Sequence, residues 1–452
     1  MTKLFKNLLA RFLFQDKGIL PTKKFLLIYL IGSICLVGLA FFGVSWQTVF
    51  IGNVLFILTS LMDLLRSPRK KYISITRHMP NEMERGKCYQ VTIHFENNAL
   101  YSCKYRLVDG IPQSFQSQFP IEGEINSKTR SSISYKTRAS VRGDYPVNKI
   151  YVRFSSLMGL WEKQIVVEQK NAVKVIPDLS ETKRYLEDAQ RYLMYDGDKI
   201  RKQKKGTGEF TRIRNYVIGD DPRKINWRQT AKLQEVMTNE YEPEHGKYIT
   251  ILIDCGRMMG VELKIGNRLE KAMEASLTVV AAALKNGDYV GVIVFSKGID
   301  VYVPPAKGMD QLQKILQAIY NVKVDASESN YAAVMNYLQM VQKKRSLILL
   351  FSDIHTFLHD ETTLLYLKRI RRRHLFFMIG VEDEALLSEA QQLPADVHRA
   401  MTKSMAQQQV LFKKREKAKW ESQGLVMIEA KEEKLAVEAV SYYIRVMNQG
   451  LI

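Results

Sequence analysis

The stretch YITILIDCGRMMG, Tyr248 to Gly260, indicates the fold of the C-terminal half of the chain. Its apolar run over residues 249–253 predicts a buried strand, and Asp254 follows at the carboxyl end of that strand. In open α/β sheets, ligands bind at that end of the strands. The stretch therefore raises the question whether Asp254 is a metal ligand or the remainder of a lost metal site.

Strands and helices alternate after this stretch, as they do in a doubly wound α/β sheet. Helices are predicted over residues 267–287, 309–322 and 331–344 and at the C-terminus, and strands over residues 289–296, 299–305, 346–353, 374–380 and 425–430. One of these strands again ends on an acid, Asp353, so two carboxylates are expected at the same edge of the sheet. Residues 247–452 are therefore predicted to form one α/β domain.

Two apolar segments lie near the N-terminus. Residues 25–44 carry no charged side chain, and residues 46–62 follow after a tight turn, so a transmembrane helical hairpin is predicted within residues 25–65. Residues 1–24 are basic, and further arginines and lysines follow the hairpin. Positive residues beside a span remain cytoplasmic, so both termini and the soluble domains are expected at the cytoplasmic face of a cell membrane, next to its lipids.

Two other interpretations of the apolar segments are open. A cleaved signal peptide would need a small-residue cleavage site before the second segment, and the sequence has none there. Two buried helices of a soluble core would also be apolar, although the uninterrupted apolar length favours the membrane hairpin.

The chain of 452 residues is long enough for two or three domains and has a formal net charge of +20. Such a surplus indicates an anionic membrane surface, an acidic partner or nucleic acid. The four cysteines, Cys35, Cys88, Cys103 and Cys255, form no C-x-x-C pair, so their spacing does not support a zinc site. A cytoplasmic location implies that they are reduced.

Residues 72–178 are predicted to form an antiparallel β-sandwich. Alternating or β-branched segments cover residues 88–97, 131–139, 149–156 and 164–169, and turn residues separate them. No convergent set of catalytic side chains is found in this region, so a structural or binding role is expected.

Residues 179–246 are predicted to be a basic connector, and its centre reads KIRKQKKGTGEFTRIRNYVIGDDPRKINWRQTAK. Asp221 is expected to cap a helix that has Pro222 in its first turn and contains Trp227. Three roles are open for this segment. A phosphate-binding glycine loop has the wrong spacing, a basic patch with interleaved aromatics would suit nucleic acid, and the third role is a docking surface or structural connector.

In the docking or connector role, the acids of the segment are expected to pair with its arginines. Asp220 and Asp221 are the acids, and Arg212, Arg214 and Arg223 are their candidate partners. Trp227 is expected to pack under the neighbouring domain, where a large aromatic side chain would be shielded from water.

The same segment follows a long family pattern. The pattern is G-x-G-x-E-F, then R-x-Y-x-x-G-D-D-x-R-x-I-D-W-x-x-T-A, then E-x-E, and Asn226 stands here in place of the usual Asp before Trp227. The matching residues include Gly206, Gly208, Glu209, Phe210, Arg212, Arg214, Tyr216, Gly219, Asp220, Asp221, Arg223 and Trp227. On these residues the chain resembles the domain of unknown function 58 (DUF58) family.

The resemblance implies an architecture and a class of partner. It implies a multidomain chain with a transmembrane helical hairpin, an antiparallel β-sandwich, the motif and a doubly wound α/β domain similar to a von Willebrand factor A domain. Members of the family are often encoded beside MoxR-type AAA+ ATPases and transglutaminase-like membrane proteins. These two classes are therefore the protein partners that the resemblance implies.

The resemblance also implies a place for a divalent cation. A von Willebrand factor A domain with a metal site carries Asp-x-Ser-x-Ser after its first strand, a Thr in a second loop and an Asp in a third, and Mg²⁺ prefers such oxygen ligands. Here Asp254, Ser329 and Asp353 keep an oxygen, whereas Gly256 and Met258 replace the two serines. The site is therefore predicted to be degenerate.

Two acids at neighbouring strand ends would repel each other unless a positive charge lay between them. Mg²⁺ could supply that charge, but the guanidinium of Arg257 is expected to lie between Asp254 and Asp353 instead. We therefore predict that the protein uses no cofactor, with Mg²⁺ as the alternative.

From the sequence we expect a non-enzymatic, membrane-anchored scaffold. It would recruit a cytoplasmic protein, a MoxR-type AAA+ ATPase, for the assembly or maturation of envelope proteins. A hydrolytic enzyme that uses Asp220, Asp221 and His245 is the first alternative, but no set of nucleophile, base and orienting group is found. Nucleic-acid binding is the second alternative, and because much of the positive charge lies beside the membrane segment, no nucleic-acid partner is expected.

Overall fold

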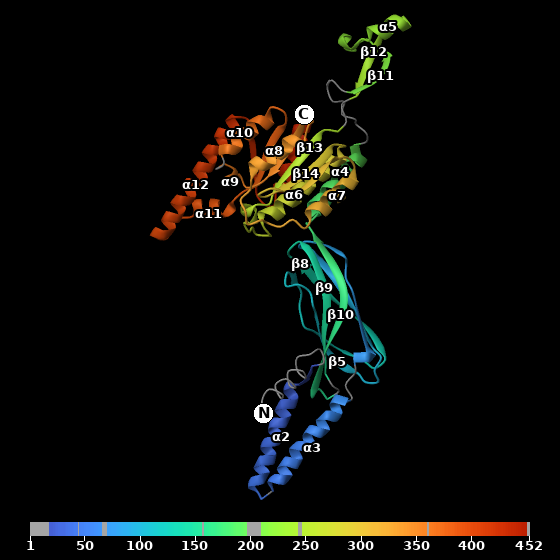
Figure 1. Ribbon diagram of the computed structural model, residues 1–452, viewed down its shortest axis with the longest axis vertical. Coiled ribbons are helices and arrows are strands. Elements are labelled where there is room, and N and C mark those ends of the chain that lie inside the picture. Colours follow the sequence, from blue (N-terminus) through green and yellow to red (C-terminus); the bar gives the residue numbers. More distant parts are fainter. Residues whose placement is uncertain are drawn as a thin grey trace. The chain divides into compact units, whose positions relative to one another are not determined.

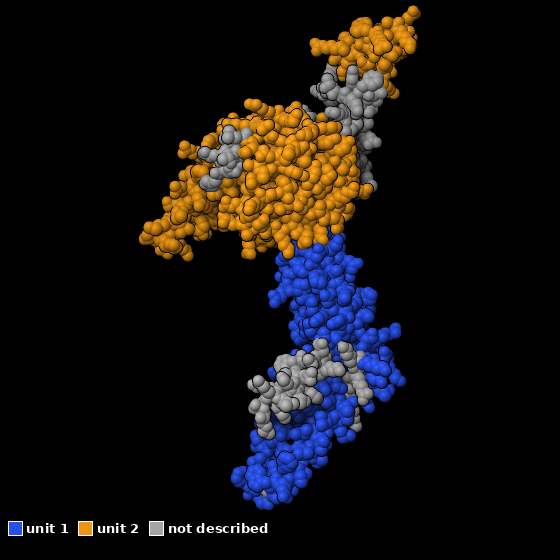
Figure 2. Space-filling model, in the orientation of Figure 1, with its two compact units in different colours: residues 1–176 blue, residues 177–452 orange. Residues whose placement is uncertain are grey.

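The structure is a computed structural model that describes residues 18–43, 45–65, 70–155, 158–196, 209–242, 246–358 and 361–449. The chain divides into two compact units, residues 1–176 and residues 177–452 (Figure 2). Gly206, Gly208 and His245 lie outside the described residues.

Two apolar helices lie near the N-terminal end of unit 1, after a short strand: α2 (Lys23–Phe41) and α3 (Trp46–Leu65). Thr22 caps α2, since its hydroxyl oxygen accepts the Phe25 N–H at 3.2 Å. Both helices are long and apolar enough to cross a membrane, and only 6% and 17% of their apolar windows are buried. Their low burial differs from that of core helices in a soluble protein, and it fits side chains that face lipid.

The rest of unit 1 consists mainly of two antiparallel sheets. One sheet has the order β1 (Ile19–Pro21), β10 (Trp161–Ile176), β9 (Gly143–Ser155), β5 (Cys103–Asp109) and β7 (Ile121–Ile125), and β3 (Glu82–Glu84) pairs in parallel with β10. The other has the order β2 (Ile73–His78), β4 (Cys88–Asn97), β8 (Thr129–Ala139) and β6 (Phe115–Gln116), with the short helix η1 (Lys70–Tyr72) before β2. The predicted strands 88–97 and 131–139 are confirmed as β4 and as part of β8.

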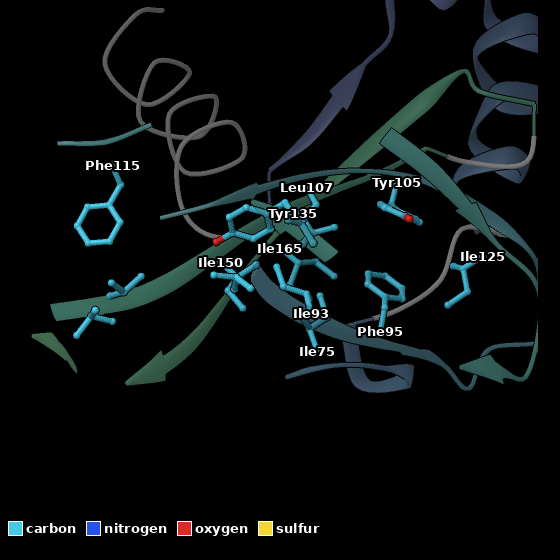
Figure 3. Close-up of a cluster of buried hydrophobic side chains, with 14 of the residues drawn as sticks. Ile75, Ile93, Phe95, Tyr105, Leu107, Phe115, Ile125, Tyr135, Ile150 and Ile165 are labelled. Atoms are coloured by element: carbon cyan, nitrogen blue, oxygen red, sulfur yellow. The ribbon is translucent and has the colours of Figure 1, made fainter. Parts of the chain in front are cut away.

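The two sheets share one apolar core (Figure 3). Alternate side chains of β5 are buried, as expected for a strand with one face on the core. Phe95 from one sheet stacks on Tyr105 from the other, with their ring centroids 5.1 Å apart. This sharing of a core between two sheets is the sandwich arrangement.

A buried ion pair also joins the two sheets, and the sequence did not reveal it. Arg77 on β2 donates from Nη1 to Oδ1 of Asp109 on β5 at 2.5 Å, and both side chains are fully buried. Tyr135 on β8 donates to the other oxygen of Asp109 at 2.6 Å. Arg77 also donates to the side chain of Asn171, at the β-bulge in β10, at 2.9 Å. The charge is therefore paired and hydrogen-bonded on several sides, as a buried charge must be.

The loop before β10 joins the sandwich to the ends of both apolar helices. Asp63 near the end of α3 accepts the backbone N–H groups of Met158 and Leu160 at 3.1 Å and 3.3 Å. Thr22 at the start of α2 donates its hydroxyl to the carbonyl oxygen of Gly159 at 2.6 Å. The ring of Phe25 lies 5.0 Å from that of Trp161. These noncovalent contacts hold the sandwich against the ends of α2 and α3, in addition to the covalent connections of the chain.

Unit 2 begins with α4 (Ser180–Asp196), in the segment that was predicted to be a connector. Its Thr182 hydroxyl lies 3.1 Å from that of Thr278, on the long helix α6. The described part of the connector that follows is a small module, and we call it the motif module: β11 (Glu209–Asn215), η2 (Pro222–Lys224), α5 (Trp227–Leu233) and β12 (Met237–Glu242), with β11 antiparallel to β12.

A six-stranded sheet forms the centre of the remaining chain (Figure 1). Its order is β15 (Ile299–Ala306), β14 (Tyr289–Phe295), β13 (Tyr248–Asp254), β16 (Ser346–Phe351), β17 (Leu375–Val381) and β18 (Val426–Ala430). The strands from β14 to β18 in this order are parallel to one another, and the edge strand β15 is antiparallel to β14. The order changes direction between β13 and β16. The carboxyl ends of these two strands therefore open the crevice in which α/β sheets bind ligands.

Helices connect the strands of this sheet, and most of them pack against it. They are η3 (Arg257–Gly260), α6 (Arg268–Lys285), α7 (Met309–Ile319), α8 (Tyr331–Val341), α9 (Ile354–Leu358), α10 (Glu361–Arg371), α11 (Glu384–Gln391), α12 (Val397–Ser422) and α13 (Leu435–Asn448). Buried side chains of α8, α9, α10 and α12 form one core cluster with those of the sheet. Helix α6 is buried over most of its length because it is rich in alanine and apolar residues.

Candidate functional site

The carboxylate of Asp254 closes β13 and is enclosed by protein donors. Its Oδ1 accepts the Gly256 N–H at 2.8 Å and the Ser329 hydroxyl at 2.5 Å. Its Oδ2 accepts the Ser352 hydroxyl at 2.5 Å and lies 3.3 Å from the Tyr331 hydroxyl. The residue is only 1% exposed. Both carboxylate oxygens are therefore already engaged by groups of the chain itself.

Burial and these hydrogen bonds act in opposite directions on the acidity of Asp254. Burial raises the pKa of the Asp254 carboxyl, and the hydrogen bonds, the Ser329 bond foremost, oppose that rise. Burial and the nearby Asp254 charge raise the pKa of Tyr331 well above its ordinary value. Tyr331 is therefore a neutral donor in this cluster.

Gly256 stands where the first serine of the metal motif would be, and the space for that serine is filled. A Cβ atom added at Gly256 would lie 2.1 Å from Oγ of Ser329 and 3.2 Å from Oδ1 of Asp254. Met258, at the second serine position, has no side-chain oxygen. The donor set needed for Mg²⁺ is therefore incomplete, and its remaining oxygens already have protein partners, so the residues present do not fit this ion.

The positive charge at the strand ends comes from Arg268, in the first turn of α6. Its Nη1 donates to Oδ1 of Asp353 at 2.7 Å, and its Nη2 donates to Oδ2 of Asp383 at 2.9 Å. Asp353 also accepts the backbone N–H of Thr356 at 2.9 Å, and Asp383 caps α11. One guanidinium thus holds two helix-capping carboxylates that follow β16 and β17.

The prediction that Arg257 lies between the two acids is wrong. Arg257 opens η3 on the surface, where its Nη2 lies 3.2 Å from the carboxylate of Glu328, and both side chains are largely exposed. Arg268 could have been suspected from the sequence, because a cation in the first turn of a helix is disfavoured by the helix dipole unless an acid is near. Ser352 was also missed, although it is a polar residue at the end of an apolar strand.

The ion pairs predicted for the motif module are confirmed in part. Arg214 donates from Nη2 to Oδ1 of Asp220 at 2.8 Å, and Arg212 donates from Nε to Oε2 of Glu240 at 2.6 Å. The hydrogen bond from Arg214 lowers the pKa of the Asp220 carboxyl, and that from Arg212 lowers the pKa of Glu240. Asp220 and Glu240 are therefore held in their charged form.

The caps of the module follow the sequence signals. The carboxylate of Asp221 accepts the Arg223 N–H at 3.1 Å, with Pro222 at the start of η2, as predicted. The expectation that the same helix contains Trp227 is wrong, because η2 ends at Lys224 and Trp227 begins α5. Asn226, which replaces the usual Asp of the pattern, caps α5 by accepting the Gln229 N–H at 3.1 Å. The side-chain amide of Asn226 also donates to the side-chain oxygen of Asn239 at 2.9 Å. The carboxylate of an aspartate at position 226 could not donate this hydrogen bond. The substitution thus retains the cap and adds a donor.

The module turns several apolar side chains toward solvent. Trp227 is 69% exposed and Ile218 is 98% exposed. The other exposed apolar residues of the module are Val217, Leu233 and Val236. The expectation that Trp227 is packed under a neighbour is therefore wrong, because it begins α5 and its side chain lies on the outer surface of that short helix.

The remaining motif residues lie in β11, in the turn that follows it and in η2. Glu209 and Phe210 begin β11 and pair with residues 242 and 241 of β12. Gly219 has a positive φ of 109°, which suits a glycine in the turn before Asp220. Tyr216 donates its hydroxyl to the carbonyl oxygen of Asp220 at 3.2 Å. Arg223 is exposed.

Among the described residues, no cluster of three or more His, Cys, Asp and Glu side chains is arranged to hold a metal ion.

Comparison with known proteins finds distant similarities. A protein named "Uncharacterized protein YeaD" of Bacillus subtilis (strain 168) is 22% identical over 207 residues, which are 45% of this chain and 50% of that protein. The match thus spans about half the length of that relative. Among solved structures, a conserved hypothetical protein BatB from Bacteroides thetaiotaomicron is 13% identical with a TM-score of 0.30, covering 45% of this chain and 100% of that one. The ASH/PapD-like domain of human CEP192 is 16% identical with a TM-score of 0.19, covering 24% and 88%.

The family comparison is the more specific. Residues 212–422 match the family described as "Protein of unknown function DUF58", and this range begins in the motif module and ends at the last residue of α12. This part of the chain is thus similar to the DUF58 family.

Proposed function

We propose that the protein is a membrane-anchored, non-enzymatic scaffold that binds a cytoplasmic protein through the motif module. The observation that carries the proposal is the exposure of Trp227 and Ile218 on that module. Exposed large apolar side chains within one small module are typical of protein interfaces, and tryptophan is among the residues that contribute most to binding.

The state of the strand-end carboxylates supports a non-enzymatic role. Asp254 accepts hydrogen bonds on both oxygens, and Asp353 is paired with Arg268 and bonded to Thr356. A general base or metal ligand must present a free lone pair to its substrate or ion. Asp220 and Asp221, the candidate acids of the hydrolytic alternative, are likewise engaged by Arg214 and by the η2 backbone.

The architecture supports the rest of the proposal. The apolar helices α2 and α3 would hold the chain in a membrane, with the basic flanks on the cytoplasmic side. The sheet order and the acids at the carboxyl ends of β13 and β16 support a von Willebrand factor A-like α/β domain. The family resemblance points to a MoxR-type AAA+ ATPase as the partner and to a transglutaminase-like membrane protein as a further component, in the assembly or maturation of envelope proteins.

The proposal is tested with the full chain in detergent and the purified MoxR-type ATPase of the same organism. Binding is measured by interferometry on the immobilised chain, with and without ATP. Replacement of Trp227 by Ala should weaken binding by about thirtyfold or more, the loss expected for a central interface residue. Ile218→Ser should weaken it too, and melting temperatures should stay close to that of the wild type.

Met405→Ala is the matched control, because Met405 is an exposed apolar residue on α12, outside the motif module. Its affinity for the ATPase should equal that of the wild type. Absence of wild-type binding would reject this partner, and equal losses in all three variants would reject the motif module as the docking surface.

A further inference from the structure

Helix α12 presents an apolar stripe on the face that points away from the core. Its packed face carries Ala406 and Trp420, which are 5% and 2% exposed, and the ring of Trp420 lies 5.4 Å from that of Phe357 on α9. The opposite face and the turn before it carry exposed apolar residues: Leu393, Val397, Met401, Met405 and Leu411. Three of these follow one another at intervals of four residues, so they share one side of the helix.

Basic side chains continue the same stripe. Arg415 follows Val397 by 18 residues, which is about five helical turns, and Lys419 lies one turn further. Across α12, seven lysines and arginines stand against two glutamates. Lys413 and Lys419 have carboxylate partners, Glu429 and Glu416, so the remaining excess is carried by the other basic side chains. The outer side of α12 is therefore apolar in the first half of the helix and basic in the second half.

We propose that this outer face of α12 lies on an anionic lipid surface, with its apolar stripe at the boundary between head groups and acyl chains. The inference rests on the proposed membrane anchoring, because a chain held in a bilayer meets lipid at high local concentration. A helix with an apolar face and many lysines and arginines binds in this way, through apolar burial and attraction to anionic head groups.

The composition of the stripe favours lipid over a protein partner. Its exposed members are Val, Met and Leu, without the Trp or Tyr that anchor protein interfaces. A convex ridge of such side chains can enter a fluid layer of lipid, whereas a protein partner must supply a matching groove. A parallel pair of stripes from two copies would bring Arg415 against Arg415, and like charges so placed repel each other.

The experiment uses the full chain reconstituted into vesicles, with an environment-sensitive NBD label on Met405→Cys. The two exposed native cysteines are removed as Cys35→Ala and Cys88→Ser, and Cys103 and Cys255 are buried and do not take the label. Vesicles contain either phosphatidylcholine alone or phosphatidylcholine with phosphatidylglycerol, and doxyl-labelled lipid serves as the quencher. Flotation on a density gradient first shows whether the chain is anchored.

We expect the doxyl lipid to quench the label at least twofold more in the anionic vesicles than in the neutral ones, and less at high salt. A label on Lys297→Cys, at an exposed position after β14, should be quenched weakly in both. Met401→Ser with Leu411→Ser should reduce quenching at position 405 to that control level, and these exposed positions leave the core intact.

Each other outcome overturns the inference in a distinguishable way. Quenching equal to the Lys297→Cys control, in a chain that floats with the vesicles, rejects the lipid contact and leaves the scaffold proposal standing. Equal quenching in neutral and anionic vesicles rejects the anionic surface. A blue-shifted label without quenching shows that protein covers the stripe. A chain that does not float removes the membrane anchoring and the inference together.

Discussion

The strand-end cluster around Asp254 and the motif module differ in what they present to solvent. In the cluster, the polar side chains face one another, and Asp254 is 1% exposed. In the module, the polar side chains also pair with one another, through Arg214 with Asp220 and Arg212 with Glu240, but large apolar side chains point outward. The sheet crevice, where α/β proteins usually bind ligands, is closed by hydrogen bonds, and the surface that invites a partner lies in a short helix and a turn.

Acidic and hydroxyl side chains at a strand end are therefore not by themselves a functional site. A carboxylate at a strand end becomes a ligand or base only when an oxygen remains free, and here serine and arginine side chains occupy those oxygens. An exposed tryptophan costs free energy unless a partner covers it.

Arg268→Ala should have the largest effect on stability. It would leave Asp353, which is 6% exposed, without its counter-ion and would also release Asp383. Removal of one partner from a buried ion pair costs about 3–5 kcal/mol. Chemical denaturation of the full chain in detergent, followed by the fluorescence of its tryptophans, measures this loss.

Arg257→Ala is the matched control. Its ion pair with Glu328 is largely exposed, so the free energy of unfolding should change by no more than about 0.5 kcal/mol. If Arg257→Ala proved the more damaging of the two, Arg257 and not Arg268 would be the cation that supports the cluster.

Gly256→Ser should destabilise the protein although it restores a residue of the metal motif. The added Cβ would lie 2.1 Å from Oγ of Ser329, and overpacking of this kind costs about 1–3 kcal/mol. Ser329→Ala combined with Gly256→Ser should recover most of the loss, because the new hydroxyl can then donate to Asp254 in place of the removed one. Melting of the single and double variants tests this, and a stable single variant would mean that Ser329 can move aside without cost.

Trp227→Ala should change the free energy of unfolding by less than about 1 kcal/mol, because the side chain is 69% exposed. This expectation replaces the larger loss that a packed tryptophan would give. Hydrogen exchange in residues 209–242 provides a local measurement. A loss of about 3 kcal/mol or more would mean that Trp227 is buried in the protein in solution, and the module would then lose its proposed contact surface.

Acid should affect the two regions in opposite directions. The pKa values of Asp220 and Glu240 are lowered by their arginine partners, so the unfolded module binds protons more readily than the folded one. The stability that they contribute is present above their unfolded pKa values, near 4, and is lost as the pH falls through the folded values. Burial raises the pKa of Asp254, so its contribution is greatest at low pH and is lost as the pH rises through its folded value.

Hydrogen exchange between pH 6 and pH 3, corrected for the intrinsic exchange rate, can separate these effects. Protection of residues 209–242 should fall before that of residues 248–254. In Arg214→Gln the pH dependence of the module should shrink, because the hydrogen bond that lowers the pKa of Asp220 is gone. Parallel loss of protection in both regions would show that the two sets of carboxylates respond alike.

Mg²⁺ should have the smallest effect, with no shift in the melting temperature of the wild type. A working site would stabilise the folded protein by about 2.7 kcal/mol at a hundredfold excess over Kd. Ca²⁺ and a chelator serve as controls. A clear shift with Mg²⁺ that disappears in Asp254→Ala would show that Ser329 and Ser352 release the carboxylate to a metal ion.

Much of the fold follows from local patterns that the sequence displays. The apolar run of residues 249–253 lies in β13, the segment 88–97 is β4, and the apolar N-terminal segments are α2 and α3. The cap by Asp221 and the pair of Arg214 with Asp220 could also be predicted, since these residues are two and six positions from their partners. Neighbours along the chain meet whatever the rest of the fold does, so periodicity and spacing are enough to predict them.

The strand-end cluster was decided by the tertiary structure. Ser352, Tyr331 and Arg268 reach their acids across 98, 77 and 85 residues, and no local pattern states which side chain will fill a given space. The sequence led us to expect one cation between Asp254 and Asp353. In the structure α6 brings Arg268 to Asp353 and Asp383, η3 turns Arg257 outward, and Asp254 is held by hydroxyl groups and the Gly256 N–H. The sequence by itself thus determined the elements and the kinds of residue at their ends. The path of the chain decided which of those residues meet, because that depends on how distant helices pack on the sheet.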